Sequence, residues 1–225
     1  MVQQNPTQST PNELEQHMPE GLKPAFETTL KYKNQIILAM AAVLAVVAIW
    51  SGVRWYNANA QTQARAELST ILQTLTGTER IAKLEELAKS APSSVEKAVL
   101  FELAALCLEE KQYDKAAQYY EQLSNDVDAE NRMVAKLGQS KALMLAGKPA
   151  DAVVILKDMS AALDKQSEDG KDIVSIMIPV NRQLAVAAEQ AGDTATAIAT
   201  LEKLQETGSS DKQFVDFKLN ELKNK

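Results

Sequence analysis

The stretch Leu100–Tyr120, LFELAALCLEEKQYDKAAQYY, decides the fold because two other segments of the chain repeat its pattern. Gly138–Leu156 reads GQSKALMLAGKPADAVVIL, and Leu184–Leu201 reads LAVAAEQAGDTATAIATL. Each segment has a helical pattern, a tight turn, a small residue early in a second helical pattern, and a large apolar residue four positions later. Self-similarity on this scale indicates a repeat protein built from stacked helix pairs.

The small residues that align the three segments are Ala116, Ala152 and Ala197, spaced by 36 and 45 residues. The first spacing is close to the roughly 34 residues of a tetratricopeptide repeat. The second spacing requires an insertion, which we place at residues 164–172. An alanine at the crossing of two antiparallel helices lets their backbones approach closely, so we expect all three alanines to be buried.

The turns of the repeats carry helix-capping residues. We expect Gly147 and Gly192 to end first helices in the left-handed conformation, and Asp193 to cap the helix that follows. The stripe formed by Ile81, Leu84 and Leu87 indicates the second helix of an earlier, degenerate pair that Pro92 closes. Ile173–Ile178 is β-branched and apolar, and we interpret it as the start of a helix with Pro179 at a kink or a restart.

An uncharged segment of 18 residues, Ile36–Val53, precedes the repeats. At about 1.5 Å per residue it is roughly 27 Å long, close to the hydrocarbon thickness of a bilayer. Both ends carry aromatic and basic side chains suited to a membrane interface, namely Tyr32, Lys33, Trp50, Arg54 and Trp55. We therefore predict a membrane anchor.

Two other interpretations of this segment are a buried core helix and a cleaved signal peptide. Ala58-Asn59-Ala60 resembles a cleavage site. The segment is nevertheless longer than the apolar core of a signal peptide, and 35 residues that include four glutamates precede it. Three lysines before the segment and two arginines after it favour a cytoplasmic N-terminus by a small margin.

These observations predict an all-α fold, a single transmembrane helix followed by a tetratricopeptide-like α-solenoid of antiparallel helix pairs. Residues 1–30 are polar, which predicts a disordered tail. We assign residues 31–56 to the transmembrane anchor with its interfacial flanks and residues 57–225 to the repeat domain. Four apolar residues after the anchor share one helix face, namely Leu68, Ile71, Leu72 and Leu75. We therefore expect the anchor helix to continue as a stalk until Gly77.

The composition argues against several kinds of function. The formal net charge is −6 and no basic cluster lies outside the membrane flanks, so nucleic acid is not expected as a partner. One cysteine, Cys107, and one histidine, His17, cannot build a disulfide or a common zinc site. Glu85-Glu86 and Glu109-Glu110 are adjacent carboxylates that point apart on a helix. We predict no catalytic residue, metal, cofactor or small-molecule substrate. We predict that Cys107 is a core residue.

The first helices of tetratricopeptide-like pairs line a groove, and the repeat frame predicts which residues face it. They are Phe101, Ala105, Leu108, Leu137, Lys141, Met144, Arg182, Val186 and Glu189. This largely apolar set with two basic residues suits an amphipathic helix or an unfolded apolar segment. Some tetratricopeptide repeats bind the C-terminal carboxylate of a partner and need asparagine at set positions. Ala105 and Val186 occupy such positions here, so this binding mode is not expected. The alternative is a groove filled from within by a C-terminal cap of Phe214, Phe217 and Leu222.

The order of these features resembles a known family. After the anchor come Arg54-Trp-Tyr-Asn57, a stalk with Ala64-Arg-Ala66, and the repeat motifs Leu103-Ala-Ala and Tyr113-Asp-Lys-Ala-Ala117. Over roughly residues 30–225 this arrangement resembles the YfgM-like ancillary subunits of the bacterial Sec translocon. The longer polar N-terminal tail and the insertion near residues 164–172 depart from that family's pattern.

The resemblance implies a bacterial inner-membrane protein with a single membrane pass, a cytoplasmic N-terminus and a periplasmic repeat domain. It also implies association with SecYEG and with a periplasmic chaperone, in the role of a non-catalytic scaffold. A second hypothesis is a structural envelope component whose repeats assemble with themselves or scaffold a division or secretion complex.

Overall fold

A computed structural model describes residues 33–126, 129–168, 173–207 and 212–224, and every regular element in these ranges is an α-helix. The helices are α3 (Lys33–Thr74), α4 (Gly77–Ser90), α5 (Ser93–Glu109), α6 (Tyr113–Asp126), α7 (Ala129–Leu145), α8 (Pro149–Glu168), α9 (Val174–Ala191), α10 (Thr194–Glu206) and α11 (Lys212–Lys223). The chain divides into two compact units, Met1–Ala58 and Asn59–Lys225. The predicted tail of residues 1–30 and the predicted interface residue Tyr32 lie outside the described residues.

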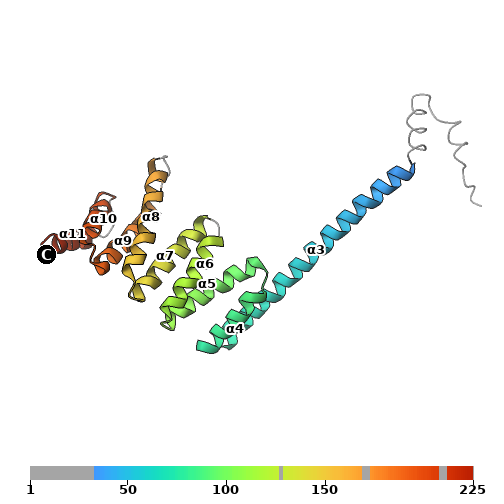
Figure 1. The fold of residues 1–225 in the computed structure, drawn as a ribbon, viewed down its shortest axis with the longest axis horizontal. Helices are drawn as coiled ribbons and strands as arrows, with labels where there is room; N and C mark the ends of the chain where they lie inside the picture. Colours follow the sequence, from blue (N-terminus) through green and yellow to red (C-terminus); the bar gives the residue numbers. More distant parts are fainter. Residues whose placement is uncertain (1–32, 127–128, 169–172, 208–211, 225) are drawn as a thin grey trace, which may run out of the picture. The chain divides into compact units, whose positions relative to one another are not determined.

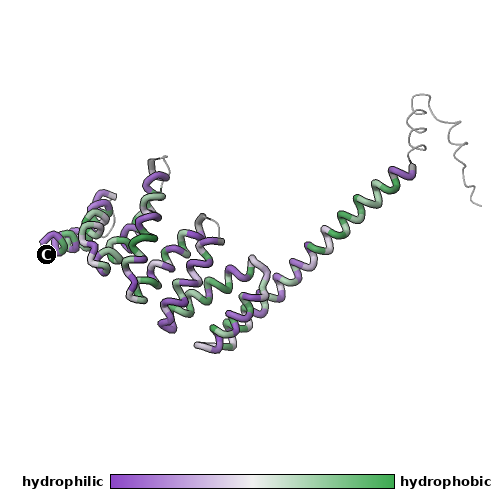
Figure 2. Tube along the Cα trace, in the orientation of Figure 1, coloured by the Kyte–Doolittle hydropathy of each residue, from purple (hydrophilic) through white to green (hydrophobic). Residues whose placement is uncertain are grey.

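The described part of the first unit is the apolar beginning of α3, visible as a continuous green stretch in Figure 2. Its large apolar side chains between Ile37 and Tyr56 are more than half exposed, and the helix is long and apolar enough to cross a membrane. Lys33 is its first residue. Trp50, Arg54 and Trp55 lie toward the other end of the apolar stretch, where the Arg54 guanidinium is 5.3 Å from the centre of the Trp50 ring. A cation–π pair of this kind suits a membrane interface.

The last part of α3 belongs to the second unit and forms the predicted stalk. Ile71 is buried there, in a cluster with Ile81 and Leu84 of α4. The Arg80 side chain donates to carbonyl oxygens at the end of α3, that of Leu72 at 3.1 Å and that of Leu75 at 2.6 Å. These bonds satisfy carbonyls that a helix end leaves without partners. The helix ends at Thr74, slightly before the expected stop, and Gly77 begins α4 with φ +58°.

Helices α4 to α11 pack in chain order as antiparallel pairs (Figure 1). The alanines predicted at the helix crossings, Ala116, Ala152 and Ala197, are all 0% exposed. Two of the large residues four positions later, Leu156 and Leu201, are also buried. The repeat frame therefore places the core correctly, and the predicted all-α solenoid is confirmed.

The same turn joins the two helices of three pairs, α5–α6, α7–α8 and α9–α10. Lys111, Gly147 and Gly192 occupy equivalent positions with φ of +58°, +75° and +75°. In each turn the next residue donates its backbone N–H to the carbonyl five residues before it, at 2.7, 2.8 and 2.9 Å respectively. This is the bond of a left-handed helix end. The two glycines were predicted here, whereas the first repeat holds a lysine in the same strained conformation.

The region around the predicted insertion differs in detail from the expectation. Residues 164–168 extend α8 to Glu168, and residues 169–172 lie outside the described ranges. The segment after them is helical as predicted, since α9 begins at Val174. Pro179 neither ends nor restarts a helix, because α9 runs through it to Ala191.

Candidate functional site

The predicted partner-facing residues lie on the first helices α5, α7 and α9, and they differ in exposure. Phe101, Leu108, Leu137, Met144 and Glu189 are half-buried, and Ala105, Lys141, Arg182 and Val186 are exposed. Phe101 packs against a small cluster of Leu123 and Ala135. Leu108, Leu137 and Met144 pack against the two larger clusters. The half-buried apolar members therefore pack between the helices, and the exposed members of the predicted set are Ala105, Lys141, Arg182 and Val186.

Neighbouring first helices are joined directly, which the sequence did not reveal. Gln183 of α9 donates its side-chain amide to the Leu137 carbonyl at 3.0 Å and to the Ser140 hydroxyl at 2.9 Å, both on α7. Ser140 is completely buried. A glutamine side-chain amide can donate to any nearby acceptor, so the sequence does not predict which acceptor Gln183 binds. The packing of α9 against α7 decides it.

The C-terminal helix α11 packs with a different face from the one expected. Val215, Leu219 and Leu222 are buried, while Phe214 is 48% and Phe217 is 64% exposed. Only Leu222 of the three predicted cap residues is buried. Positions 215, 219 and 222 share one helical stripe that faces α10, and the two phenylalanines lie off that stripe.

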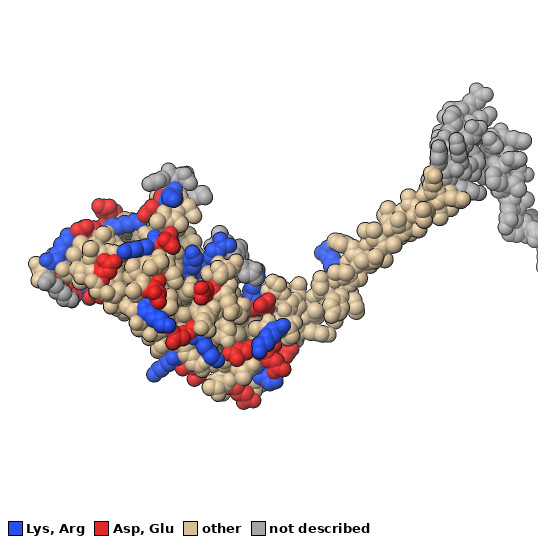
Figure 3. Space-filling view, in the orientation of Figure 1, with Lys and Arg blue, Asp and Glu red and all other residues tan. Residues whose placement is uncertain are grey.

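The second helices α4 and α6 are linked by polar contacts. The Tyr119 hydroxyl donates to Glu85 Oε1 at 2.7 Å, and Lys115 Nζ lies 3.2 Å from the same oxygen. The bond from Tyr119 is the main cause that lowers the pKa of Glu85, while burial raises the pKa of the Tyr119 phenol. Lysines and acidic residues are interspersed over the face of the repeat unit that Figure 3 shows.

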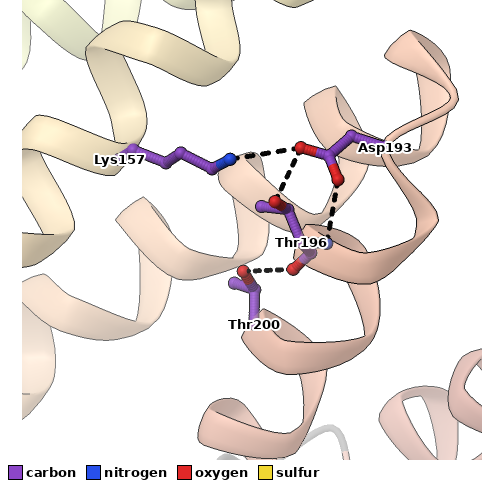
Figure 4. Close-up of polar contacts among 4 residues, drawn as sticks. All are labelled: Lys157, Asp193, Thr196 and Thr200. Atoms are coloured by element: carbon purple, nitrogen blue, oxygen red, sulfur yellow. Dashed lines mark hydrogen bonds and ion pairs between the residues drawn. The ribbon is translucent and has the colours of Figure 1, made fainter.

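A capping interaction at the start of α10 confirms the prediction for Asp193 (Figure 4). Its carboxylate accepts the Thr196 backbone N–H at 3.1 Å and the Thr196 hydroxyl at 2.6 Å. Lys157 of α8 donates to the same carboxylate at 3.1 Å. These bonds, that of the Thr196 hydroxyl first, lower the pKa of Asp193 to about 2. Asp193 therefore caps α10 and ties it to the preceding repeat.

Cys107 and Glu86, whose side chains could take part in chemistry, lie in surroundings that suit packing and ion pairing. Cys107 is 0% exposed, and burial raises the pKa of its thiol. Glu86 is paired with Lys83 at 2.8 Å, away from the partners of Glu85. Within the described ranges, no group of three or more His, Cys, Asp or Glu side chains is placed to hold a metal ion.

Comparison with known proteins identifies the fold. The chain is similar to a crystal structure of nearly identical TPR-like repeats from a kinesin light chain of Podospora anserina. The TM-score is 0.50 and the sequence identity 20%, over 88% of this chain and 100% of that chain. No protein-family model and no curated protein matches the chain. The likeness is one of fold, so the chain has a tetratricopeptide-like repeat architecture.

Proposed function

We propose that this protein is a non-catalytic scaffold, anchored in a membrane, whose repeats hold partner proteins beside the bilayer. The observation that supports the proposal is α3, a single helix from Lys33 to Thr74. Its first part is apolar and exposed, and its last turns are packed into the repeat core. Because one helix serves both purposes, a protein bound by the repeats is tethered to the membrane.

The more specific proposal is an accessory subunit of the Sec translocon that associates with SecYEG and with a periplasmic chaperone. It rests on the resemblance of residues 30–225 to YfgM-like subunits. The corresponding location is the bacterial inner membrane, with the N-terminus in the cytoplasm and the repeats in the periplasm. Protease added to spheroplasts should then degrade the repeat domain, and protection of that domain would contradict this topology.

The first-helix surface of Lys141, Arg182 and Val186 is the proposed partner site. All three residues are exposed, Val186 by 37%, and two of them are basic. An amphipathic helix with acidic residues flanking its apolar stripe would match this surface. A partner bound there would lose contact if the apolar position became charged.

The deciding experiment is co-purification of the full-length protein from membranes in mild detergent. We expect Sec-translocon subunits to co-purify, and a variant whose residues 36–53 are replaced by an unrelated spanning segment to lose them. Val186→Arg should lose a repeat-bound partner. Val154→Arg is the matched control, because Val154 is 62% exposed on the second helix α8. Recovery of the same partners by all variants would refute the assigned surfaces.

A second candidate function, a self-assembling envelope component, is favoured by the exposed phenylalanines of α11. Phe214 and Phe217 lie three positions apart on the last described helix of the solenoid. Light scattering of the purified full-length protein over a range of concentrations tests this candidate. A concentration-dependent oligomer that is lost on Phe217→Ser would favour self-assembly over the scaffold role.

A further inference from the structure

The last described helix, α11, has the position of a further first helix. A shift of 35 residues along the chain aligns the buried stripe of α9 with that of α11. The buried residues that correspond are Val180 and Val215, Leu184 and Leu219, and Ala187 and Leu222. Each stripe fits a helix that packs on the second helix before it, α8 for α9 and α10 for α11.

The same shift relates the polar side chains that join neighbouring first helices. Gln183 of α9 bonds to α7. The residue 35 positions later, Lys218 of α11, donates to Glu189 of α9 at 2.9 Å. Helices α7, α9 and α11 are therefore successive members of one series of first helices.

This correspondence places an exposed phenylalanine in line with the apolar residues of the other first helices. Phe214 of α11 corresponds to Pro179 of α9. The repeat spacings of 45 and 36 residues continue the set to Val134 of α7 and Ala98 of α5. All four residues are exposed, Val134 by 57% and Phe214 by 48%. They form an apolar row, one residue on each first helix.

The second exposed phenylalanine of α11 belongs to the same side of the helix. Phe217 corresponds to Arg182 of the first-helix surface. The opposite flank of α11 is polar and bonded to α10, because Asp216 accepts a hydrogen bond from Gln205 at 2.6 Å and Lys223 pairs with an α10 glutamate at 2.6 Å. The exposed apolar area of α11 therefore continues the first-helix surface.

The spacing of the apolar row suits a helical partner. Packed helices have axes about 8–10 Å apart, so members of the row recur at about that interval. A helix that lies across the first helices rises about 10.5 Å in seven residues. Apolar residues seven positions apart, which share one face of that helix, would therefore reach successive members of the row.

The charges beside the row indicate the polar residues of that partner. Lys141 of α7 is exposed and forms no ion pair within the described ranges. The carboxylates of Glu189 and Glu221 are both bonded to Lys218. On α5, by contrast, Glu109 is exposed. Because complementary charges fix the register of a complex, an acidic partner fits α7, α9 and α11 better than α5.

We infer that the partner surface extends from α7 across α9 to α11 and binds an acidic amphipathic helix, whose apolar stripe contacts Val134, Pro179 and Phe214. The inference rests on the proposed scaffold function and adds the kind of partner and the α11 phenylalanines to it. Aromatic side chains often carry a large share of binding energy, so Phe214 and Phe217 are the anchors of this surface. They then serve partner binding and not self-assembly.

The test measures binding of a fluorescent designed peptide to the full-length protein in nanodiscs of a neutral phospholipid, by fluorescence anisotropy. The peptide is helical, with leucines that repeat every seven residues on one face and glutamates on both sides of that face. A second peptide has lysines in place of the glutamates, and empty nanodiscs give the background. We expect the glutamate peptide to bind saturably and more tightly than the lysine peptide, and Lys141→Glu to reduce this preference.

Serine variants of exposed residues locate the binding surface without disturbing the core. Phe214→Ser should weaken binding of the glutamate peptide by about tenfold or more, because much of the ring is buried on binding. Val134→Ser should weaken it at the α7 end. Val154→Ser is the matched control, since Val154 is 62% exposed on the second helix α8.

The possible failures of the inference and of the proposed function are distinct. The inference is overturned if the glutamate peptide does not bind saturably, or if Phe214→Ser binds it as the wild type does. It is also overturned if Phe214→Ser abolishes a concentration-dependent oligomer and leaves peptide binding unchanged, which would assign the phenylalanines to self-assembly. Absence of Sec-translocon subunits from the co-purification, with peptide binding as expected, would refute only the translocon role.

Discussion

Replacing Gly138 by alanine tests the close contact between α6 and α7. A Cβ atom built on Gly138 lies 2.5, 2.6 and 2.8 Å from Cε1, Cζ and Cδ1 of the Tyr120 ring. Because carbon atoms in contact are about 3.5–4.0 Å apart, the ring or the helix would have to move by roughly 1 Å. Tyr120 packs against the cluster of Leu123 and Ala135, which restricts that movement.

Two opposing terms set the size of the effect. Alanine is favoured over glycine in a helix interior by about 1 kcal/mol. Forcing extra volume into a packed site costs about 1–3 kcal/mol, and a ring fixed on several sides belongs in the upper part of that range. The free energy of unfolding should therefore fall by about 1–2 kcal/mol in Gly138→Ala.

Urea unfolding of residues 59–225, followed by circular dichroism at 222 nm, measures this change. In a Tyr120→Leu background the ring is absent, so Gly138→Ala should instead raise the free energy of unfolding by up to about 1 kcal/mol. The reversal of sign between the two backgrounds isolates the contact. A Gly138→Ala protein at least as stable as the wild type, or an equal effect in both backgrounds, would refute the reasoning.

The remaining predictions concern a turn, a helix cap and a thiol. Lys111→Gly should raise the free energy of unfolding by about 0.5–1 kcal/mol, because glycine adopts the left-handed conformation without strain, and Gly147→Lys should lower it. Urea unfolding measures both changes. A Lys111→Gly protein less stable than the wild type would show that Lys111 is not strained. Asp193→Ala should cost about 1 kcal/mol at pH 7 through loss of the α10 cap. The pKa of Asp193 in the folded protein is about 2, below its value in the unfolded chain. The stabilisation by this carboxylate should therefore be complete above the unfolded pKa and disappear as the pH falls through 2. A stability difference between wild type and Asp193→Ala that stays constant over about pH 2–7 would exclude the carboxylate as its source. Cys107 should react with a maleimide only after denaturant is added, and rapid labelling of the folded protein would show that the thiol is accessible.

The sequence by itself determined the architecture of this protein. The uncharged segment from residue 36 to 53 indicated the anchor, and the aligned alanines and glycines indicated the helix pairs and their turns. Ala116, Ala152 and Ala197 are buried as expected, and Gly147 and Gly192 are left-handed. These features were predictable because helix periodicity, helix ends and close crossings depend on residues a few positions apart in the chain.

The tertiary structure alone decided which side chains meet across repeats. On α11, an apolar pattern offered both phenylalanines and Val215, and packing against α10 selected Val215. Gln183 of α9 bonds to α7, and Ser160 of α8 donates its hydroxyl to the buried Asn181 of α9. These partners lie 21 to 46 residues apart in sequence. A local pattern specifies the face of a helix, but the burial and pairing of a polar group depend on the helix that packs against it.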